Sequence, residues 1–262
     1  FTNTYLGDYP MFLPGGKEQI AGEYQPGWML LSYGKKVSVS SSLEGYPAEN
    51  IVDEDARTAW VAQSNRDMEW AQVDLQRLSS IHAIQVNFDE YGANQKGAVS
   101  GVYQSYLIYA SVNGEDWSLV VDYGTKKTDT PHDYIEFEEP FKARYIKLQN
   151  KEYMVSENFS VRDLRIFGKG QGSTPRAVND FTVERDEADP CKARLCWEAV
   201  PDAQGYIVRY GIAGDKLYNN FQVMGENTLE IGSLNKGVAY YFTIDAYNEN
   251  GITRTSRIKV CR

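Results

Sequence analysis

Short stretches in which apolar and polar residues alternate recur along almost the whole chain, and this pattern limits the fold more than any other feature. Alternation with a period of two is typical of strands that bury one face. Blocks with the 3.6-residue period of an amphipathic helix are hard to find. Many short strands without intervening helices form a sandwich or a barrel. The sequence therefore predicts an all-β protein.

The expected strands fall into two sets on either side of a Gly-, Ser- and Pro-containing stretch. They are 37–40, 70–75, 81–88, 105–111, 134–137, 144–148 and 163–167, then 181–183, 194–198, 206–210, 228–231, 240–246 and 257–260. Because 262 residues can bury two cores, we expect modules at 32–168 and 175–262 with a linker at 169–174. Asn113-Gly114 predicts a type I′ hairpin turn, whose two positions both need positive φ.

Composition excludes several function classes. The net charge of −9 argues against nucleic acid and anionic membranes as partners, since both require a basic patch. No apolar run reaches the roughly 18 residues of a membrane span. His82 and His132 are the only histidines, and neither belongs to a nucleophile or zinc motif. We therefore expect no enzyme activity from these residues, although paired carboxylates for glycoside cleavage stay open because their pairing is spatial.

Residues 175–262 resemble a fibronectin type III domain. Leu195 and Trp197 on one strand, and the run 240–251, carry this resemblance. It implies an immunoglobulin-like sandwich with Trp197 in the core and Tyr240 at the tyrosine corner. Such a module would space or brace its neighbour.

The three cysteines, Cys191, Cys196 and Cys261, lie in the last third of the chain. On sequence alone they suit either one disulfide in an oxidising compartment or three reduced thiols. In a fibronectin-type topology, the first turn and the end of the last strand share one pole. The resemblance therefore implies a Cys191–Cys261 disulfide and a free Cys196.

Residues 32–168 resemble a discoidin, or coagulation-factor type C, domain. The matching stretches are 47–60, 69–75, 111–117, 143–148 and 158–168. This resemblance implies a non-catalytic jelly-roll β-sandwich with Trp60, Trp70 and Trp117 in its core.

The opening stretches 4–10 and 27–33 are similar to the tail that joins a five-bladed propeller to such a module in bacterial family forty-three glycoside hydrolases. Residues 1–31 are then the tail of an upstream catalytic domain, or a linker. This similarity implies a secreted, periplasmic or cell-surface polypeptide in which the catalytic domain is a partner of the two modules.

The discoidin resemblance implies a structural calcium ion. Asp53, Asp55 and Thr58 place oxygen ligands at short spacing in one loop, as calcium requires. The family closes this loop with an acidic residue, usually Glu, at the start of the final strand, where this chain has Asp163. The expected ligands are Asn50, Asp53, Asp55, Thr58, Arg162 and Asp163, with Asn50 and Arg162 contributing carbonyls. The alternative is a loop of solvated acids that cap turns.

Carbohydrate binding is the second implied property. Galactose-binding discoidin modules use a His and an Arg at positions where this chain has Val61 and Asp89-Glu90. The polar and aromatic side chains that remain on the expected loop face are Tyr46, Tyr91, Asn94, Tyr103, Asn158 and Phe159. Their rings could stack on sugar C–H surfaces and their amides could bond hydroxyls, or they could pack the loops.

Two functions follow from these patterns. The discoidin-like module could weakly bind a neutral polysaccharide near an upstream glycosidase. Alternatively, both modules could be structural spacers that pack on that catalytic domain without binding glycan.

Overall fold

The computed structural model describes residues 12–14, 26–93 and 101–262. These residues form strands β1–β17 and one 3₁₀ helix, η1 (Ala48–Val52), so the all-β prediction is confirmed. The chain divides into two compact units, Leu30–Gln171 and Gly172–Arg262, with Phe1–Met29 grouped with the second. This division falls inside the expected linker at 169–174. Within the described ranges, no helix is long and apolar enough to cross a membrane.

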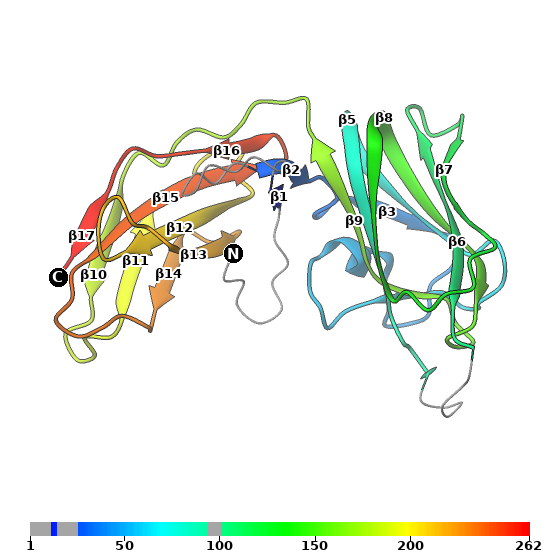
Figure 1. The fold of residues 1–262 in the computed structure, drawn as a ribbon, viewed down its shortest axis with the longest axis horizontal. Coiled ribbons are helices and arrows are strands. Elements are labelled where there is room, and N and C mark those ends of the chain that lie inside the picture. The colour runs from blue at the N-terminus through cyan, green and yellow to red at the C-terminus, as the bar shows by residue number, and fades with distance from the viewer. Residues whose placement is uncertain (1–11, 15–25, 94–100) are drawn as a thin grey trace. The chain divides into compact units, whose positions relative to one another are not determined.

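The first unit is an antiparallel sandwich (Figure 1). Its strands are β3 (Lys36–Val39), β4 (Trp60–Val61), β5 (Trp70–Phe88), β6 (Gln104–Ser111), β7 (Ser118–Tyr123), β8 (His132–Tyr153) and β9 (Ser160–Lys169). They pair in the order β9-β5-β8-β6-β7, with β3 added to β5 and β4 added to β9. Strands β1 (Phe12–Pro14) and β2 (Pro26–Leu30) pair antiparallel with each other.

Two long strands, β5 and β8, pass through both layers of this sandwich. Their pairing is interrupted between Asp74 and Ser79, where Gln76 adopts a φ of +67°. Residues 71–74 pair with β3 and 70–74 pair with 145–149 of β8. In the other half, 80–88 pair with β9 and 79–87 pair with 132–143 of β8. The expected strands 70–75 and 81–88 are therefore two halves of one bent strand. The largest fully buried side chains between the layers include Trp60, Tyr106 and Phe159.

Some local expectations were wrong. Asn113 and Gly114 lie in a six-residue connection at 112–117, in which only Gly114 has positive φ. The Asn113 side chain instead accepts hydrogen bonds from the backbone N–H groups of residues 115 and 116, so no type I′ turn forms. Trp60 is fully buried as predicted, but Trp70 and Trp117 are partly exposed. The Lys147 ammonium lies 4.0 Å from the centre of the Trp117 ring.

The second unit is a smaller sandwich. A sheet of β10 (Phe181–Arg185), β11 (Ala193–Trp197) and β14 (Thr228–Ile231) packs on β12 (Gly205–Gly211), β13 (Asn219–Met224), β15 (Tyr240–Asn248), β16 (Gly251–Thr253) and β17 (Lys259–Cys261). Trp197 is only 5% exposed and lies in this core, as predicted. The Tyr240 hydroxyl accepts a hydrogen bond from the Asn235 backbone N–H at 3.2 Å. This is the upstream backbone contact expected of a tyrosine corner.

The cysteines of the second unit are not bonded to one another. All three are free thiols, so the structure does not contain the expected Cys191–Cys261 disulfide. Arg185 lies near both Cys191 and Cys261. It donates to the carbonyl of Pro190, the residue before Cys191. Burial raises the pKa of Cys261, and the positive charge of Arg185 lowers it by a smaller amount. The pairing therefore stays a prediction, which mass spectrometry of the unreduced protein tests.

Candidate functional site

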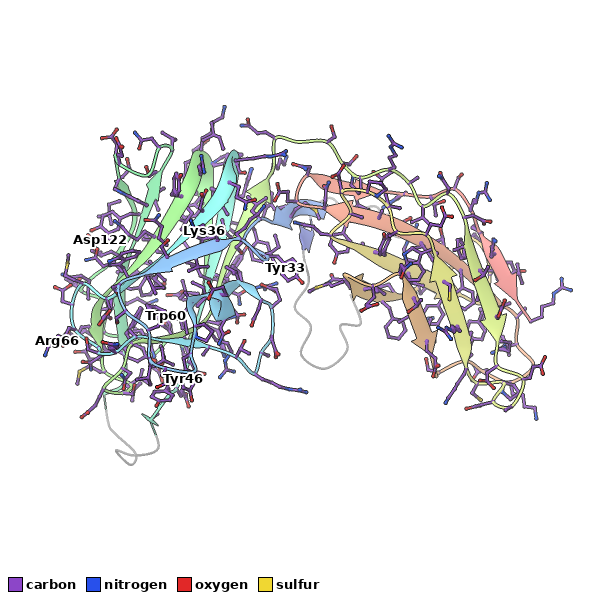
Figure 2. All side chains as sticks on the ribbon, turned by 180° about the vertical axis from the view of Figure 1, so that it is seen from behind. Tyr33, Lys36, Tyr46, Trp60, Arg66 and Asp122 are labelled. Atoms are coloured by element: carbon purple, nitrogen blue, oxygen red, sulfur yellow. The ribbon has the colours of Figure 1, made fainter. Side chains whose placement is uncertain are left out.

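The loops that carry the predicted sugar-binding residues meet at one end of the first sandwich, which we call the loop pole. It comprises segments 40–47, 62–69, 89–93, 101–103, 124–131 and 154–159. Backbone and side-chain hydrogen bonds tie these segments together. Gln63 N–H donates to Ser41 Oγ at 3.0 Å, and Asn65 Nδ2 donates to the Ser156 carbonyl at 2.8 Å. Figure 2 shows Tyr46 and Arg66 toward this end of the unit.

Tyr46 and Tyr91 form an aromatic pair at this pole. Their ring centres are 4.9 Å apart and their planes meet at 68°, which is an edge-to-face contact. Both side chains are partly exposed. Tyr46 ends a turn closed by its own N–H and the Leu43 carbonyl, at 3.1 Å. Two residues from separate loops therefore present one aromatic surface.

Tyr103 lies in a second cluster at the loop pole. The Lys127 ammonium donates to the Tyr103 hydroxyl at 3.1 Å and lies 4.9 Å from the centre of the ring. Lys127 also pairs with Glu152 at 3.2 Å. The cation therefore occupies the neighbourhood of this ring, which leaves Tyr103 less available for stacking than Tyr46 or Tyr91.

The remaining predicted sugar-binding residues do not form a surface. Phe159 is fully buried and contacts the rings of Trp60 and Tyr153, so its assignment to sugar binding was wrong. Asn158 uses its amide to donate to the Ala62 carbonyl at 2.9 Å. Asn94 lies outside the described residues.

The two positions that depart from the galactose-binding pattern are occupied by structural groups. Val61 is fully buried. Asp89 pairs with Arg162, and its carbonyl accepts hydrogen bonds from the hydroxyls of Ser160 and Tyr153. Val61 and Asp89 are thus used in packing and hydrogen bonding, whereas Glu90 is exposed and presents a carboxylate at this position.

The loop pole also contains a hydrogen-bonded polar cluster around Glu69, which could not be predicted from the sequence. The Glu69 carboxylate accepts hydrogen bonds from three serine hydroxyls, of Ser40, Ser41 and Ser64. Burial alone would raise the pKa of Glu69, but these donors and the Arg66 charge hold it below its usual value. Asn150, which is fully buried, donates its amide to the carbonyls of residues 65 and 66 at 2.8 and 3.0 Å. The 64–69 segment is therefore held in one conformation.

The expected calcium loop brings several oxygens together. Thr58 Oγ1 lies 2.8 Å from Asp53 Oδ2 and 3.0 Å from the Asp55 carbonyl oxygen. Asp163 is fully buried, and Asn87 Nδ2 donates to its Oδ2 at 2.9 Å, while its Oδ1 has no hydrogen-bond partner within the described ranges. Burial raises the pKa of Asp163, and the charge of Asp53 raises it further.

A cation would stabilise a carboxylate oxygen that lacks a hydrogen-bond donor and lies close to a second carboxylate. Among the described residues, no three His, Cys, Asp or Glu side chains gather in a metal-binding group. Hydroxyl and carbonyl oxygens would therefore have to complete a calcium site, and Thr58 and Asp55 supply both kinds. The Asn50 side chain donates to the Ala59 carbonyl at 2.8 Å, which leaves only its own carbonyl as a ligand.

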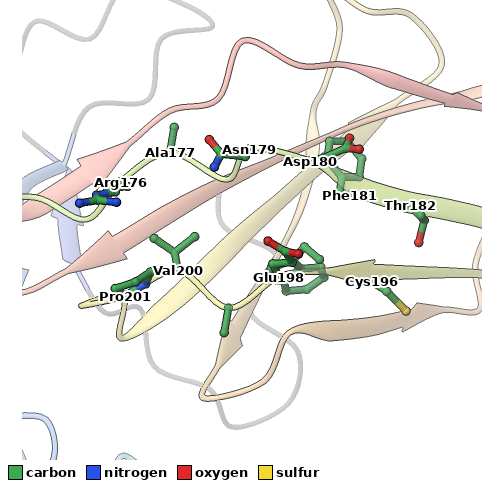
Figure 3. Close-up of a pocket in the computed structure, with 12 residues that line it drawn as sticks. Arg176, Ala177, Asn179, Asp180, Phe181, Thr182, Cys196, Glu198, Val200 and Pro201 are labelled. Carbon is green, nitrogen blue, oxygen red and sulfur yellow. The ribbon is translucent and has the colours of Figure 1, made fainter.

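The second unit has a surface pocket of about 460 Å³ between segments 176–182 and 196–201 (Figure 3). Asp180 at its rim is held by Lys259 at 2.8 Å and Arg257 at 3.3 Å. Trp197 lines the pocket, and its buried Nε1 has no hydrogen-bond partner in the part of the chain that the structure describes. None of the predicted sugar-binding residues lies in this unit.

Comparison with known families agrees with the fold of the first unit. Residues 36–163 match the F5/8 type C domain family, so this part of the chain is a discoidin-type domain. Rat and mouse (Rattus norvegicus and Mus musculus) lactadherin are 33% and 32% identical over alignments of 110 residues, and each alignment covers 39% of this chain. Those residues cover 25% and 23% of the two relatives, so the chain spans about a quarter of their length.

Solved structures with similar folds include two bacterial modules. Chitosan-binding module 1 of a Paenibacillus sp. IK-5 chitosanase/glucanase is 20% identical, with a TM-score of 0.45 over 53% of this chain and 98% of that one. The family 32 carbohydrate-binding module of C. perfringens NanJ, solved with galactose, is 18% identical, with a TM-score of 0.43 over 53% of this chain and 97% of that one.

Proposed function

We propose that the F5/8 type C domain is a non-catalytic carbohydrate-binding module that weakly binds a neutral polysaccharide at the loop pole. The observation that carries this function is the partly exposed Tyr46–Tyr91 pair, which two loops hold in edge-to-face contact. Aromatic faces of this kind stack on the C–H surfaces of sugar rings. The family match gives the fold, and the resemblance to galactose-binding discoidin modules gives the ligand class.

The affinity should be low, because an open loop surface desolvates few sugar units at a time. We expect dissociation constants nearer millimolar than nanomolar, which is roughly −4 to −6 kcal/mol. A linked catalytic domain would make such an affinity sufficient, since tethering raises the effective concentration of substrate.

A glycan array followed by calorimetry on the whole chain tests this function. Tyr46→Ala and Tyr91→Ala should each weaken binding of a neutral glycan about tenfold. The control is Tyr134→Ala, because Tyr134 is 44% exposed on β8 and lies outside the loop pole. No binding of any neutral glycan at millimolar concentration, with the chain folded, would contradict the proposal.

A structural role is the second candidate, and one observation favours it. Phe159 and the Asn158 amide are both used inside the module, so part of the predicted sugar surface is packing. In this function both units would space or brace an upstream catalytic domain of a secreted or cell-surface polysaccharide-degrading glycosidase. Co-purification of the chain with the separately expressed upstream domain, without glycan binding, would support it.

For the second unit we propose a fibronectin type III module. It is supported by the three-stranded sheet β10-β11-β14 packed on the β12–β13–β15 sheet, and by the Tyr240 contact with Asn235. Large aromatic residues such as Trp197 and Phe242 are buried in the core of this unit, so they are not available to stack on a ligand. This suits a spacing or bracing role.

For the first unit we further propose a structural calcium ion in the 53–58 loop. Oxygen atoms of Asp53, Asp55, Thr58 and Asp163 would hold it, together with the carbonyls of Asn50 and Arg162. The support is the position of Thr58 Oγ1, 2.8 Å from Asp53 Oδ2 and 3.0 Å from the Asp55 carbonyl oxygen, together with the buried Oδ1 of Asp163, which has no hydrogen-bond partner among the described residues. Such an ion would fix the loop and take no part in a reaction.

A further inference from the structure

A groove of about 510 Å³ lies at the loop pole where the 62–69 segment meets the end of β3. Its volume is within the roughly 300–1,000 Å³ of small-molecule sites. Gln63, Arg66, Asp67, Met68 and Glu69 line it, together with serine hydroxyls. None of these residues belongs to the sugar-binding set predicted from the sequence.

The backbone at Met68 is strained, and in this conformation the apolar Met68 side chain lines the groove. Met68 adopts a φ of +85°, a conformation that costs a residue with a side chain about 1–3 kcal/mol. Its N–H donates to the Asn150 carbonyl at 3.3 Å, and Gln149 Nε2 lies 3.2 Å from its sulfur. The side chain is nevertheless 62% exposed. A strained residue held by its neighbours and left open to solvent suggests a role in contact with a ligand.

Polar groups with unused bonding capacity surround Met68. Within the described part of the chain, the Arg66 guanidinium has no hydrogen-bond or ion-pair partner, although it lines the groove. Asp67 uses Oδ2 to pair with Lys151 at 2.5 Å, which leaves Oδ1 as an acceptor. Gln63 donates from Nε2 to the Ser42 carbonyl at 3.3 Å, which leaves its amide oxygen. The groove thus offers free donors beside free acceptors.

The formal charges around the groove balance. Arg66 and Lys151 carry two positive charges, and Asp67 and Glu69 carry two negative ones. A uronate carboxylate would gain Arg66 but face two carboxylates, whereas neutral vicinal hydroxyls can accept from Arg66 and donate to Asp67. The methionine side chain suits the C–H face of the same sugar ring.

We propose that this groove is a second sugar subsite, which binds an uncharged hexose unit through adjacent hydroxyls. It rests on the proposed function of the loop pole and adds a polar subsite to the Tyr46–Tyr91 surface. The conformation fixed by Asn150 and Glu69 means that little ordering entropy is lost on binding.

Calorimetry of the whole chain with a neutral oligosaccharide selected from a glycan array tests the subsite. Arg66→Gln should weaken binding about tenfold, the effect of one hydrogen bond from a charged donor. Met68→Gly should weaken binding by a similar factor while the melting temperature is unchanged or higher, because glycine adopts positive φ without strain. Arg77→Gln is the matched control, since Arg77 is exposed in the 76–78 turn of β5.

An oligouronate of the same length provides the second arm, and we expect it to bind about tenfold more weakly than the neutral chain. Tighter binding of the oligouronate would overturn the assigned ligand class. If the neutral glycan binds and Tyr46→Ala weakens it, but Arg66→Gln and Met68→Gly do not, the subsite is overturned and the proposed function stands. Absence of glycan binding by the unaltered chain would instead overturn the proposed function.

Discussion

Arg165 and Glu54, which lie 111 residues apart in sequence, form an ion pair inside the first sandwich. Arg165 Nε lies 3.2 and 3.0 Å from the two carboxylate oxygens of Glu54, and each side chain is 3% exposed. Arg165 also donates to Gln85 Oε1 at 3.0 Å. The pair connects the loop after η1 to β9 and β5, and thus braces the loop proposed to hold calcium.

Breaking this pair should destabilise the first unit strongly. Arg165→Met or Glu54→Gln leaves one charged group buried without its partner, which costs about 3–5 kcal/mol. The double variant Glu54→Met/Arg165→Met should lose less than the sum of the two, because no lone charge remains. Urea denaturation at a fixed calcium concentration measures all three. If the free energies of unfolding of the single variants lie within about 0.5 kcal/mol of that of the unaltered chain, the pair is accessible to solvent and the prediction is wrong.

Calcium should stabilise the folded first unit. An ion that binds only the folded state contributes about 2.7 kcal/mol at a free concentration one hundred times its dissociation constant. We expect chelation to lower the melting temperature, and Asp53→Ala to remove the difference between chelated and calcium-replete protein. Glu139→Ala is the control, since Glu139 is exposed and far in sequence from the loop. Identical melting curves with and without chelator would leave only turn-capping acids at this position.

Glu69 should make the stability of the loop pole dependent on pH. Its pKa is lower in the folded chain than its ordinary value of 4.5, so its stabilising effect is complete above that value and is lost as pH falls through the folded pKa. At pH 7, Glu69→Gln should cost about 1–2 kcal/mol, allowing for its partial exposure. The difference between the two proteins should close below about pH 4. A gap that stays constant from pH 7 to pH 3 would contradict this assignment.

The Tyr240 contact should matter to the second unit alone. Tyr240→Phe removes the acceptor of the Asn235 N–H and should destabilise this unit by about 1–2 kcal/mol. Tyr218→Phe is the matched control, because Tyr218 is 74% exposed and should tolerate the loss of its hydroxyl. Differential scanning calorimetry, in which the two units can melt separately, measures the effect. Equal melting of both variants would mean that the hydroxyl contact is dispensable.

Several strands were predicted closely from the alternation of apolar and polar residues. The alternation in 206–210 and 240–246 became β12 and β15, and 228–231 became β14 with the same bounds. Strand β7 (Ser118–Tyr123) was not predicted, because three apolar residues follow one another in its sequence and the alternation is weak. Regular alternation therefore mattered more than burial, because β14 was predicted although only Ile231 of its four residues is buried.

The candidate site was less predictable than the fold, for a spatial reason. Phe159 follows a polar loop residue and therefore suggests an exposed ring, but it packs against Trp60 on β4. Asn150 lies on β8, two residues beyond the predicted strand 144–148. Nothing near it in sequence reveals that its amide donates to the carbonyls of Asn65 and Arg66, which precede it by 85 and 84 positions. Hydrogen bonds of this range are set by the packing of distant segments, whereas motifs report only neighbours along the chain.

The continuity of β5 and β8 through both layers has a consequence for how the first sandwich opens. In a sandwich whose sheets are built from separate strands, one sheet can fray while the other persists. Here each sheet contains half of β5 and half of β8, so loosening either layer pulls on the backbone of the other. The amide protons of residues 70–74 and 79–88 should consequently exchange with solvent at similar rates, as members of one cooperative unit. The loop pole would then be carried by a scaffold that opens as a whole or not at all.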